Sequence, residues 1–400
     1  MKRSLAISCV AALVATQAFS FTWKAKSIAE EKSALIARLE RSDVACPGLQ
    51  SPQDFAARLA GDSGTISWMQ AAIDYGSALL KVTEGRDATD PVRRLGLEVI
   101  DYPLHVDNYG GKLADDERNA FNEAVLGYAR TTRDRVVKEV RAARVPDGQL
   151  WIWRIYNMAF ILKGPQHTVA IDLTSRPVLP RAPQVWAAED WKAVAEIVDL
   201  AVVTHPHGDH TSEPFLREMM RLGKPLVLPG DVSTYVIREG RPVAIPYTTG
   251  PSCVKLVEDH KDPVDVAGVG FRNFRGFQDS VPCNVYLMDI DGVRVVDNGD
   301  NYDRGKEKML EQAPPADVVI ASTWNQVHHV LTCVQAAPGF SPEQAVFVPA
   351  HENELGHSVA HRESYLEMYT MPERLGKPAF PLTRTFPLGW GECLKYVRGK

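Results

Sequence analysis

The chain has 400 residues, of which 45% are hydrophobic, 24% charged and 8% aromatic. These are the proportions of a globular protein with a sizeable core, and they exclude a disordered, collagen-like or coiled-coil chain. The formal net charge is −5 at pH 7 and no long basic run occurs, which argues against a protein that binds nucleic acid through a basic patch or stripe.

The first twenty residues have the layout of a secretory signal peptide. Met1 to Arg3 form a positively charged start, Ser4 to Val14 a short apolar stretch, and Ala18 to Ser20 a small-x-small cleavage site. We therefore expect residues 1–20 to be removed and the mature chain to be periplasmic or secreted; an uncleaved anchor is the alternative. Because no later run of about 18 apolar residues follows, we expect no membrane span in the mature chain.

Cysteine usage is compatible with export. Of six cysteines, Cys9 would leave with the signal peptide, and an odd number would remain. At least one of them must stay unpaired or bridge to another chain, and one disulfide is possible in an oxidising compartment. No two form a CxxC pair, which excludes a cysteine zinc knuckle. The five remaining cysteines are Cys46, Cys253, Cys283, Cys333 and Cys393.

Residues 21–148 are predicted to form an all-helical N-terminal region. Apolar residues recur at helical spacing in two stretches, from Ile66 to Leu80 and from Phe121 to Val140. Ser51 and Pro52 are typical of a helix start. No group of catalytic residues stands out here, so we expect these helices to pack on the domain that follows.

From residue 149 to 400 the pattern changes to short strands alternating with helices, which indicates a layered α/β domain. Paired strands are expected over Leu150 to Leu162 and Thr168 to Leu173, because both are rich in branched and aromatic residues around a Gly-Pro break. Helices are expected at about 188–197 and 214–222. Further strands are predicted at 199–204, 226–228, 269–274, 284–290, 293–296, 318–321 and 345–348.

The strongest chemical signal is the run His205, His207, Asp209 and His210, directly after a predicted strand. Imidazole nitrogens and a carboxylate so close together suit zinc or a similar divalent ion. Residues two apart do not share a helix face, so His205 and His207 need a loop to converge. Gly208 permits the bend that lets Asp209 and His210 point to a second centre.

This HxHxDH run resembles the signature of the metallo-β-lactamase superfamily. The resemblance covers roughly residues 150–365, implies an αββα sandwich, and is closest to the lactonase and phospholipase-like branch. It also implies an aspartate that bridges two metal ions after a hairpin, which Asp300 in the hairpin 284–301 matches, and a histidine after a late strand, which His351 matches. Asp297 competes with Asp300, but Gly299 directly before Asp300 favours the latter.

The sequence departs from that family at one ligand. The resemblance implies a further histidine near 277–280, where this chain has Phe-Gln-Asp-Ser. The first centre would keep His205 and His207, with Asp300, and lack its third imidazole. Gln278 would be a poor zinc ligand because its amide oxygen is neutral, and Asp279 would be a better one.

The second centre would be complete, with Asp209, His210, Asp300 and His351. His357 is a candidate for the missing ligand, a group that orients ligands or contacts substrate, or a plain surface residue. Glu352 and Glu354 either orient ligands or contact substrate, or are solvated loop carboxylates.

These residues predict a secreted metal-dependent hydrolase that acts on a small molecule. Metal ions would activate a water, and Asp209 would both bind metal and position that water for attack on an ester, lactone, amide or related bond. One or two Zn²⁺ ions are expected, although another divalent ion is possible. The alternatives are a metal-binding protein with an incomplete site and no catalysis, and a phosphodiesterase of the same fold. Four aromatic residues either line a substrate pocket or belong to the core: Trp153, Tyr156, Tyr286 and Trp324.

Overall fold

The computed structural model describes residues 27–399 apart from 107–112, 175–184, 231–232, 239–240, 247–251, 260–261, 279–280, 304, 324–326, 360–361 and 371–378. The predicted signal peptide at 1–20, the candidate ligand Asp279 and the candidate pocket residue Trp324 lie outside the described residues. Among the helices that are described, none is both long and apolar enough to cross a membrane.

The N-terminal region is helical, as predicted. Capping residues begin three of its helices: Ser27 and Ser51 each accept a backbone N–H bond in the first turn, and Asp90 accepts two ahead of Pro91. Its end at residue 148 stays a prediction. The five helices are α1 (Ile28–Glu40), α2 (Pro52–Gly61), α3 (Thr65–Val82), α4 (Pro91–Leu104) and α5 (Asp115–Ala142).

Two larger sheets and a small hairpin form the rest of the molecule. The first sheet has the order β15 (Cys393–Val397), β1 (Gln149–Arg154), β2 (Phe160–Lys163), β3 (Thr168–Ile171), β4 (Leu200–Val202), β5 (Leu226–Leu228), β8 (Cys253–Lys255). The second has the order β14 (Val346–Ala350), β13 (Val318–Ser322), β12 (Val293–Asp297), β11 (Val281–Ile290), β10 (Val269–Gln278), β9 (Val264–Val266). The remaining elements are the hairpin β6 (Ser233–Arg238) and β7 (Arg241–Pro246), the helices α6 (Ala188–Ile197), α7 (Glu213–Arg221) and α8 (Val327–Gln335), and a 3₁₀ turn at Leu382–Arg384.

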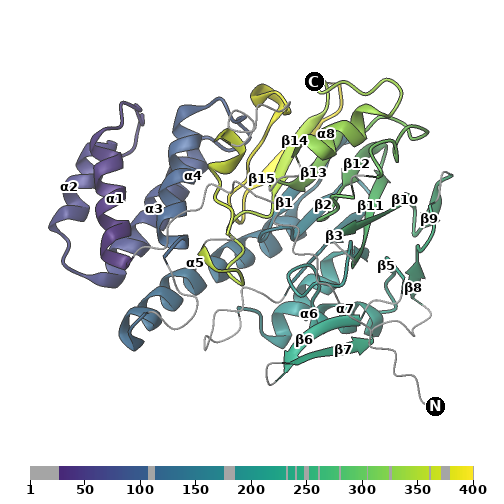
Figure 1. Ribbon diagram of the computed structural model, residues 1–400, viewed down its shortest axis with the longest axis horizontal. Helices are drawn as coiled ribbons and strands as arrows, with labels where there is room; N and C mark the ends of the chain where they lie inside the picture. Colours follow the sequence, from purple (N-terminus) through teal and green to yellow (C-terminus); the bar gives the residue numbers. More distant parts are fainter. Residues whose placement is uncertain are drawn as a thin grey trace, which may run out of the picture.

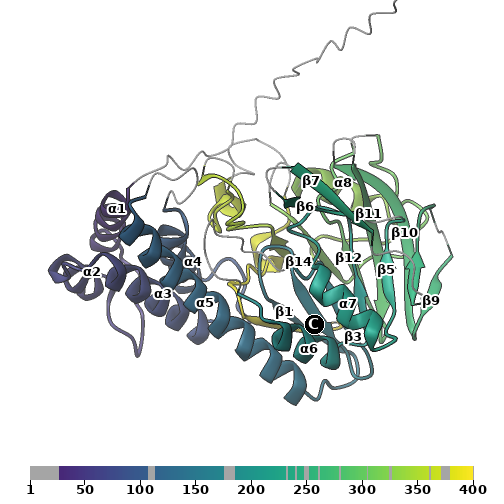
Figure 2. The same cartoon turned by 90° about the horizontal axis from the view of Figure 1, so that it is seen from below.

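The two sheets face each other, and helices cover their outer faces. Phe160 and Ile171 of the first sheet share one buried core with Met288 and Ile320 of the second. Because side chains alternate along a strand, neighbouring residues of the first sheet, such as Ile161, instead pack with α1–α7. The outer face of the second sheet packs on α8. The αββα sandwich predicted from the sequence is therefore confirmed, with the helical region at one side of it (Figures 1 and 2).

The sheet topology brings several strand ends to one place. β3, β4 and β5 are parallel, as are β12, β13 and β14. The carboxyl ends of parallel strands meet at one edge of a sheet. The chain leaves β4 toward His205, leaves β12 toward Asp300 and leaves β14 directly into His351. The fold therefore carries the predicted ligands on loops that leave the sheets at matching edges.

Two details differ from the sequence prediction. β10 is longer than expected and runs to Gln278, which pairs with Val281 of β11. Gln278 is therefore part of the β-sheet and not of a loop. Among the described residues, no disulfide joins any of the five cysteines that follow the predicted signal peptide.

Candidate metal centre

Asp172, at the end of β3, organises the loop that carries the histidine run. Its carboxylate accepts hydrogen bonds from the Thr204 backbone N–H at 2.8 Å and from the Thr204 hydroxyl at 2.6 Å. The same carboxylate lies 2.7 Å from Nδ1 of His210. A partner on Nδ1 fixes the imidazole orientation and leaves Nε2 for a ligand. Asp172 therefore aims His210 into the site.

A glycine makes the approach of Asp300 possible. Gly299 has a φ of +50°, and a Cβ there would lie 2.7 Å from the Thr204 Cβ and 3.0 Å from the Cys283 Sγ. Only glycine fits this close contact between the loops after β4 and β12. Asp297 stays behind the turn, where it accepts a bond from the Gly299 N–H at 3.1 Å. Burial, and then the charge of Asp172, raise the pKa of Asp297 well above its usual value.

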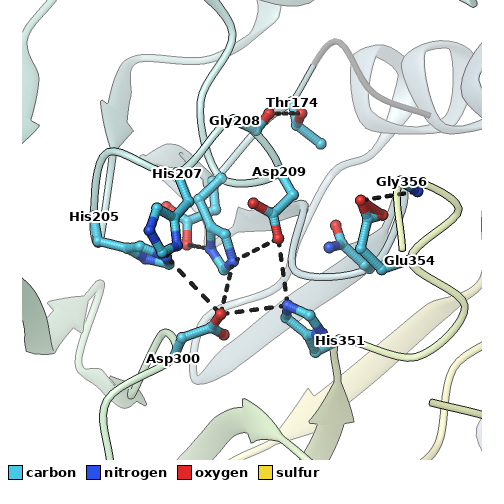
Figure 3. Close-up of polar contacts among 12 residues, drawn as sticks. Thr174, His205, His207, Gly208, Asp209, Asp300, His351, Glu354 and Gly356 are labelled. Atoms are coloured by element: carbon cyan, nitrogen blue, oxygen red, sulfur yellow. Dashed lines mark hydrogen bonds and ion pairs between the residues drawn. The ribbon is translucent and has the colours of Figure 1, made fainter. Parts of the chain in front are cut away.

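Four buried side chains meet in the centre of the site (Figure 3). Oδ2 of Asp209 lies 3.5 Å from Nε2 of His210 and 3.4 Å from Nε2 of His351. Oδ2 of Asp300 lies 3.4 Å from each of the same two nitrogens. One ligand atom from each of the four residues falls within 4.8 Å of all the others.

These separations fit a single divalent ion. Four atoms bound tetrahedrally at about 2.0–2.2 Å from one ion lie about 3.3–3.6 Å apart. Nε2 of His210 and Nε2 of His351 are both buried, and their contacts with the Asp209 and Asp300 carboxylates, at 3.4–3.5 Å, are longer than usual hydrogen bonds. A buried polar atom normally has a partner. The donor set of two imidazoles and two carboxylates suits zinc or another borderline ion.

The four groups also stabilise one another's charge. Burial raises the pKa of Asp209 and of Asp300, but the positive charges of His210 and His351 outweigh burial and hold both pKa values well below normal. Burial lowers the pKa of His210 and His351, and the carboxylates outweigh it and raise both pKa values well above normal. Metal binding needs neutral imidazole, so an arriving ion must displace these protons.

His205 and His207 lie beside this centre, and the described residues, which leave out the candidate ligand Asp279, supply no third imidazole to them. Nε2 of His205 lies 3.1 Å from Nδ1 of His207 and 3.9 Å from Oδ2 of Asp300. Gln278 lies where a third ligand of this pair would be expected, and its Nε2 donates to Oδ2 of Asp300 at 3.0 Å. Burial is the main cause that lowers the pKa of both histidines, which favours neutral imidazoles. The pair thus has the chemistry of a metal site but lacks a third imidazole.

The loop after β14 supplies the remaining donor. His351 adopts a φ of +71°, and its backbone N–H donates to the Asn157 carbonyl at 3.2 Å. Nδ1 of His351 lies 3.9 Å from Glu363, a buried carboxylate that also accepts a bond from the Thr323 hydroxyl at 2.8 Å. Nδ1 of His351 thus faces Glu363, while Nε2, on the opposite side of the ring, faces Asp209 and Asp300.

Glu352 and Glu354 are fully buried, so the interpretation as solvated loop carboxylates is wrong. Glu352 lies 2.6 Å from Nη2 of Arg154, whose side chain is also inaccessible to solvent. Glu354 accepts a bond from the Tyr156 hydroxyl at 2.6 Å. Loop carboxylates are usually exposed, and here buried donors from the strand β1 and the residues after it draw them inward.

His357 lies beside the centre. It is partly exposed, and one ligand atom from each of His357, Glu354 and Asp209 lies within 4.8 Å of the other two. Asp209 therefore belongs to both groups of potential ligands. Trp153 and Tyr286 are buried in the two cores, whereas Tyr156 uses its hydroxyl to hold Glu354.

Sequence reasoning missed three buried charged residues that contact the loops around the centre: Asp172, Arg154 and Asp101. Asp172 follows an apolar strand, and a charged residue at such a strand end is a usable signal. Arg154 ends β1 and Asp101 lies in α4, and nothing local distinguishes them from surface residues. Their roles depend on contacts with residues 198 and 252 positions away.

Comparison with known proteins gives matches at the level of structure alone. No protein-family model matches the chain, and no curated protein matches it. Similar solved structures include a metallo hydrolase from Ignicoccus hospitalis, with 16% identity and a TM-score of 0.41 over 62% of this chain and 98% of that one. A second is an isothiocyanate hydrolase from Delia radicum gut bacteria, with 13% identity and a TM-score of 0.40, covering 62% of this chain and 99% of that one. A third is the metallo-β-lactamase fold protein YhfI from Bacillus subtilis, with 10% identity and a TM-score of 0.39, covering 62% of this chain and 100% of that one. The chain itself has the two-sheet αββα sandwich that the resemblance of its histidine run implied.

Proposed function

We propose that this protein is a metal-dependent hydrolase of the metallo-β-lactamase superfamily whose principal ion is held by Asp209, His210, Asp300 and His351. The observation that carries the proposal is the set of four ligand atoms, separated by 3.4–3.5 Å along four edges. Two of these atoms are buried nitrogens whose contacts with the carboxylates are longer than usual hydrogen bonds. A cation accounts for both observations.

A divalent ion bound there would act as a Lewis acid, lowering the pKa of a bound water and polarising a substrate oxygen. The chain supplies the positioning. Asp172 orients His210, Gly299 lets Asp300 approach, and the loop after β14 holds His351. Asp209 lies between the four-residue group and the group with Glu354 and His357, which places it to orient the attacking water as a catalytic residue.

The substrate class follows from chemistry more than from shape. A metal-activated water attacks a carbonyl or phosphoryl centre. We favour a small-molecule ester, lactone, amide or related bond, since the chain carries a net charge of −5 and no basic run that would attract a polyanion. A phosphodiester is the second class to test.

Zinc is the proposed ion because two imidazoles and two carboxylates form a borderline donor set. We expect one firmly held ion per chain, and a second, weaker one beside His205 and His207. Export to the periplasm or secretion is part of the proposal and is supported by the layout of residues 1–20. The mass and N-terminal sequence of chain recovered from a periplasmic fraction would test it.

The central experiment measures metal content and turnover on the same protein. The purified mature chain is analysed for zinc, iron and manganese and assayed on an ester, a lactone, an amide and bis-nitrophenyl phosphate. Variants Asp300→Asn and His351→Ala are compared with His167→Ala. His167 is the control because it is also a histidine with a carboxylate partner, Asp291, but it is only partly buried and lies outside the site.

We expect both site variants to lose the ion and about a hundredfold or more of the activity, while His167→Ala keeps both. A chain that holds one ion but hydrolyses none of the four substrate classes would support the metal-binding alternative. Full activity and metal content in His351→Ala would contradict the proposal.

A further inference from the structure

The turn at the end of α4 is the part of the helical region that contacts the loop of His351. Asp101 is fully buried, and its Oδ1 accepts a bond from Nδ2 of Asn353 at 2.9 Å and another from the Tyr365 backbone N–H at 3.1 Å. Asn353 and Tyr365 lie near the two ends of the segment 351–365. One carboxylate from α4 therefore ties both ends of this segment together.

Other contacts extend from the same turn of α4. Arg362 donates from Nη1 to the Leu104 carbonyl and from Nη2 to the His357 carbonyl at 2.9 Å. His105 directs Nε2 at the Arg362 carbonyl, 3.4 Å away. The end of α4 thus contacts the segment at Asn353, Arg362 and Tyr365. Both overall views show the yellow C-terminal part of the chain beside α4 (Figures 1 and 2).

The other end of α4 is fixed to the sandwich. Arg93 is fully buried, and its two terminal nitrogens lie 3.1 and 2.8 Å from the two carboxylate oxygens of Glu392. Its Nε donates to the Pro387 carbonyl at 3.0 Å. A bidentate pair of this kind fixes direction as well as distance. Asp101 therefore holds the segment against a helix that is itself held in place.

The backbone of the segment requires such support. His351 and Asn353 have φ values of +71° and +60°. This left-handed conformation is unfavourable for residues other than glycine, although asparagine tolerates it better than most. It persists where the surrounding contacts determine it. The bond from Asp101 to Asn353 is such a contact, and it acts two residues from the proposed ligand His351.

A purely stabilising role would not favour a carboxylate here. Burial is the main cause that raises the pKa of Asp101 well above its usual value, and Oδ2 of Asp101 has no hydrogen-bond partner among the described residues. An apolar residue of similar volume is often the more stable choice at a buried position. The carboxylate adds two directional hydrogen bonds, which orient the Asn353 side chain and the Tyr365 backbone N–H.

We infer that Asp101 is a positioning residue for the metal centre: it holds Asn353 and Tyr365 and so fixes the loop that presents His351, two residues before Asn353, to Asp209 and Asp300. The helical N-terminal region is thereby part of the support of the centre. This inference rests on the proposed function, because it assigns Asp101 to a metal ligand that the proposed function requires.

The test measures Co²⁺ affinity and the visible Co²⁺ spectrum of the metal-free mature chain, at a temperature where every variant is folded. Asp101→Ala removes both accepted bonds, and Asp101→Asn keeps an oxygen that can accept them. Asn353→Gly removes the donor from the other side while tolerating the positive φ. Leu97→Ala, which removes a fully buried side chain from the same helix, is the control for a loss of stability alone.

We expect Asp101→Ala and Asn353→Gly each to weaken Co²⁺ binding about tenfold, at the lower end of the range for groups that orient ligands, and to change the spectrum. Asp101→Asn should stay within about twofold of the unaltered chain, and the double variant Asp101→Ala, Asn353→Gly should bind no more weakly than either single variant, because both remove one interaction. Leu97→Ala should bind Co²⁺ normally.

Unchanged affinity in both Asp101→Ala and Asn353→Gly would overturn the inference, as would equal weakening by Leu97→Ala. If Asp101→Ala does not fold, Asn353→Gly decides alone. These outcomes leave the proposed function intact. An unaltered chain that binds no Co²⁺ would overturn the proposed function and this inference together.

Discussion

Two loops carry most of the proposed ligands, and different regions of the molecule support them. The loop with His205 to His210 is anchored within the sandwich, where Asp172 and the Thr204 side chain fix it. The segment from His351 to Tyr365 is anchored on β1 through Arg154 and on α4 through Asp101. The contacts of the first loop lie at one sheet edge, whereas those of the second join residues 198 and 252 positions apart. A metal centre of this geometry therefore depends on both the sandwich and the helices.

The largest expected effect concerns Arg154, at the base of the second loop. Arg154→Met would leave Glu352 charged and unpaired in a site with no access to solvent. We expect a loss of about 3–5 kcal/mol in the free energy of unfolding, measured by urea denaturation. The double variant Arg154→Met, Glu352→Leu should regain the part that comes from the unpaired carboxylate. It should not regain the part that comes from the Tyr156, Asn157 and Leu388 carbonyls, which accept hydrogen bonds from Arg154.

The control for this pair is Arg217→Met, because Arg217 pairs with Glu213 on the surface of α7, with 62% of the arginine side chain exposed. Such pairs contribute little, so little change is expected. If Arg154→Met were equally harmless, the second loop would not depend on its buried ion pair.

The next effect concerns the support of the first loop. Asp172→Ala frees Nδ1 of His210 and the Thr204 hydroxyl. Zinc affinity should fall about 10- to 100-fold, as measured by competition with a chelating dye. Asp199→Ala is the control. Asp199 directly precedes β4 and also accepts a backbone N–H bond, from Thr168, but it is exposed. Equal zinc affinity in the Asp172 and Asp199 variants would show that the sandwich does not orient His210.

A histidine placed beside His205 and His207, where a third metal ligand is lacking, should increase zinc binding. Gln278→His would place a third imidazole beside His205 and His207, on the side that now donates to Asp300. We expect the variant to retain two zinc ions per chain after dialysis where the unaltered chain retains one, a gain of about tenfold or more in the second affinity. Gln166→His, at an exposed position, controls for added surface histidine. Two ions already retained by the unaltered chain would contradict the weaker second site.

The smallest effect is a change in pH dependence. Burial raises the pKa of Asp101 in the folded chain, so the folded state binds this proton more tightly than the unfolded state does. The stability that the proton contributes is present below the unfolded pKa, about 3.9, and is lost as pH rises through the folded value. Asp101→Asn should therefore lose less stability than the unaltered chain as pH rises from about 4, measured by urea denaturation at several pH values. Parallel curves would contradict a raised pKa at Asp101.

The sequence predicts the fold class and the ligand loops because their signals are local. Branched residues mark the strands, and four potential ligands fall within six residues at 205–210. Asp300 and His351 each follow a strand, and parallel pairing brings strand ends together. The remainder depends on distant contacts. That Glu352 and Glu354 are buried follows from Arg154 and Tyr156, about two hundred residues earlier, and the position of Gln278 follows from the length of β10.

The core that the helices share with the sandwich has a consequence for cooperativity. Leu355 and Tyr365 of the C-terminal segment belong to the same buried cluster as Leu79 and Ile100 of the helices and Ile161 of the first sheet. Residues 144–148 between α5 and β1 are mostly exposed, but the buried cluster extends across this boundary and joins the helices to the first sheet. We therefore expect one melting transition for the whole chain, and a fragment that starts near residue 149 would expose the apolar surface that the helices now cover and would aggregate.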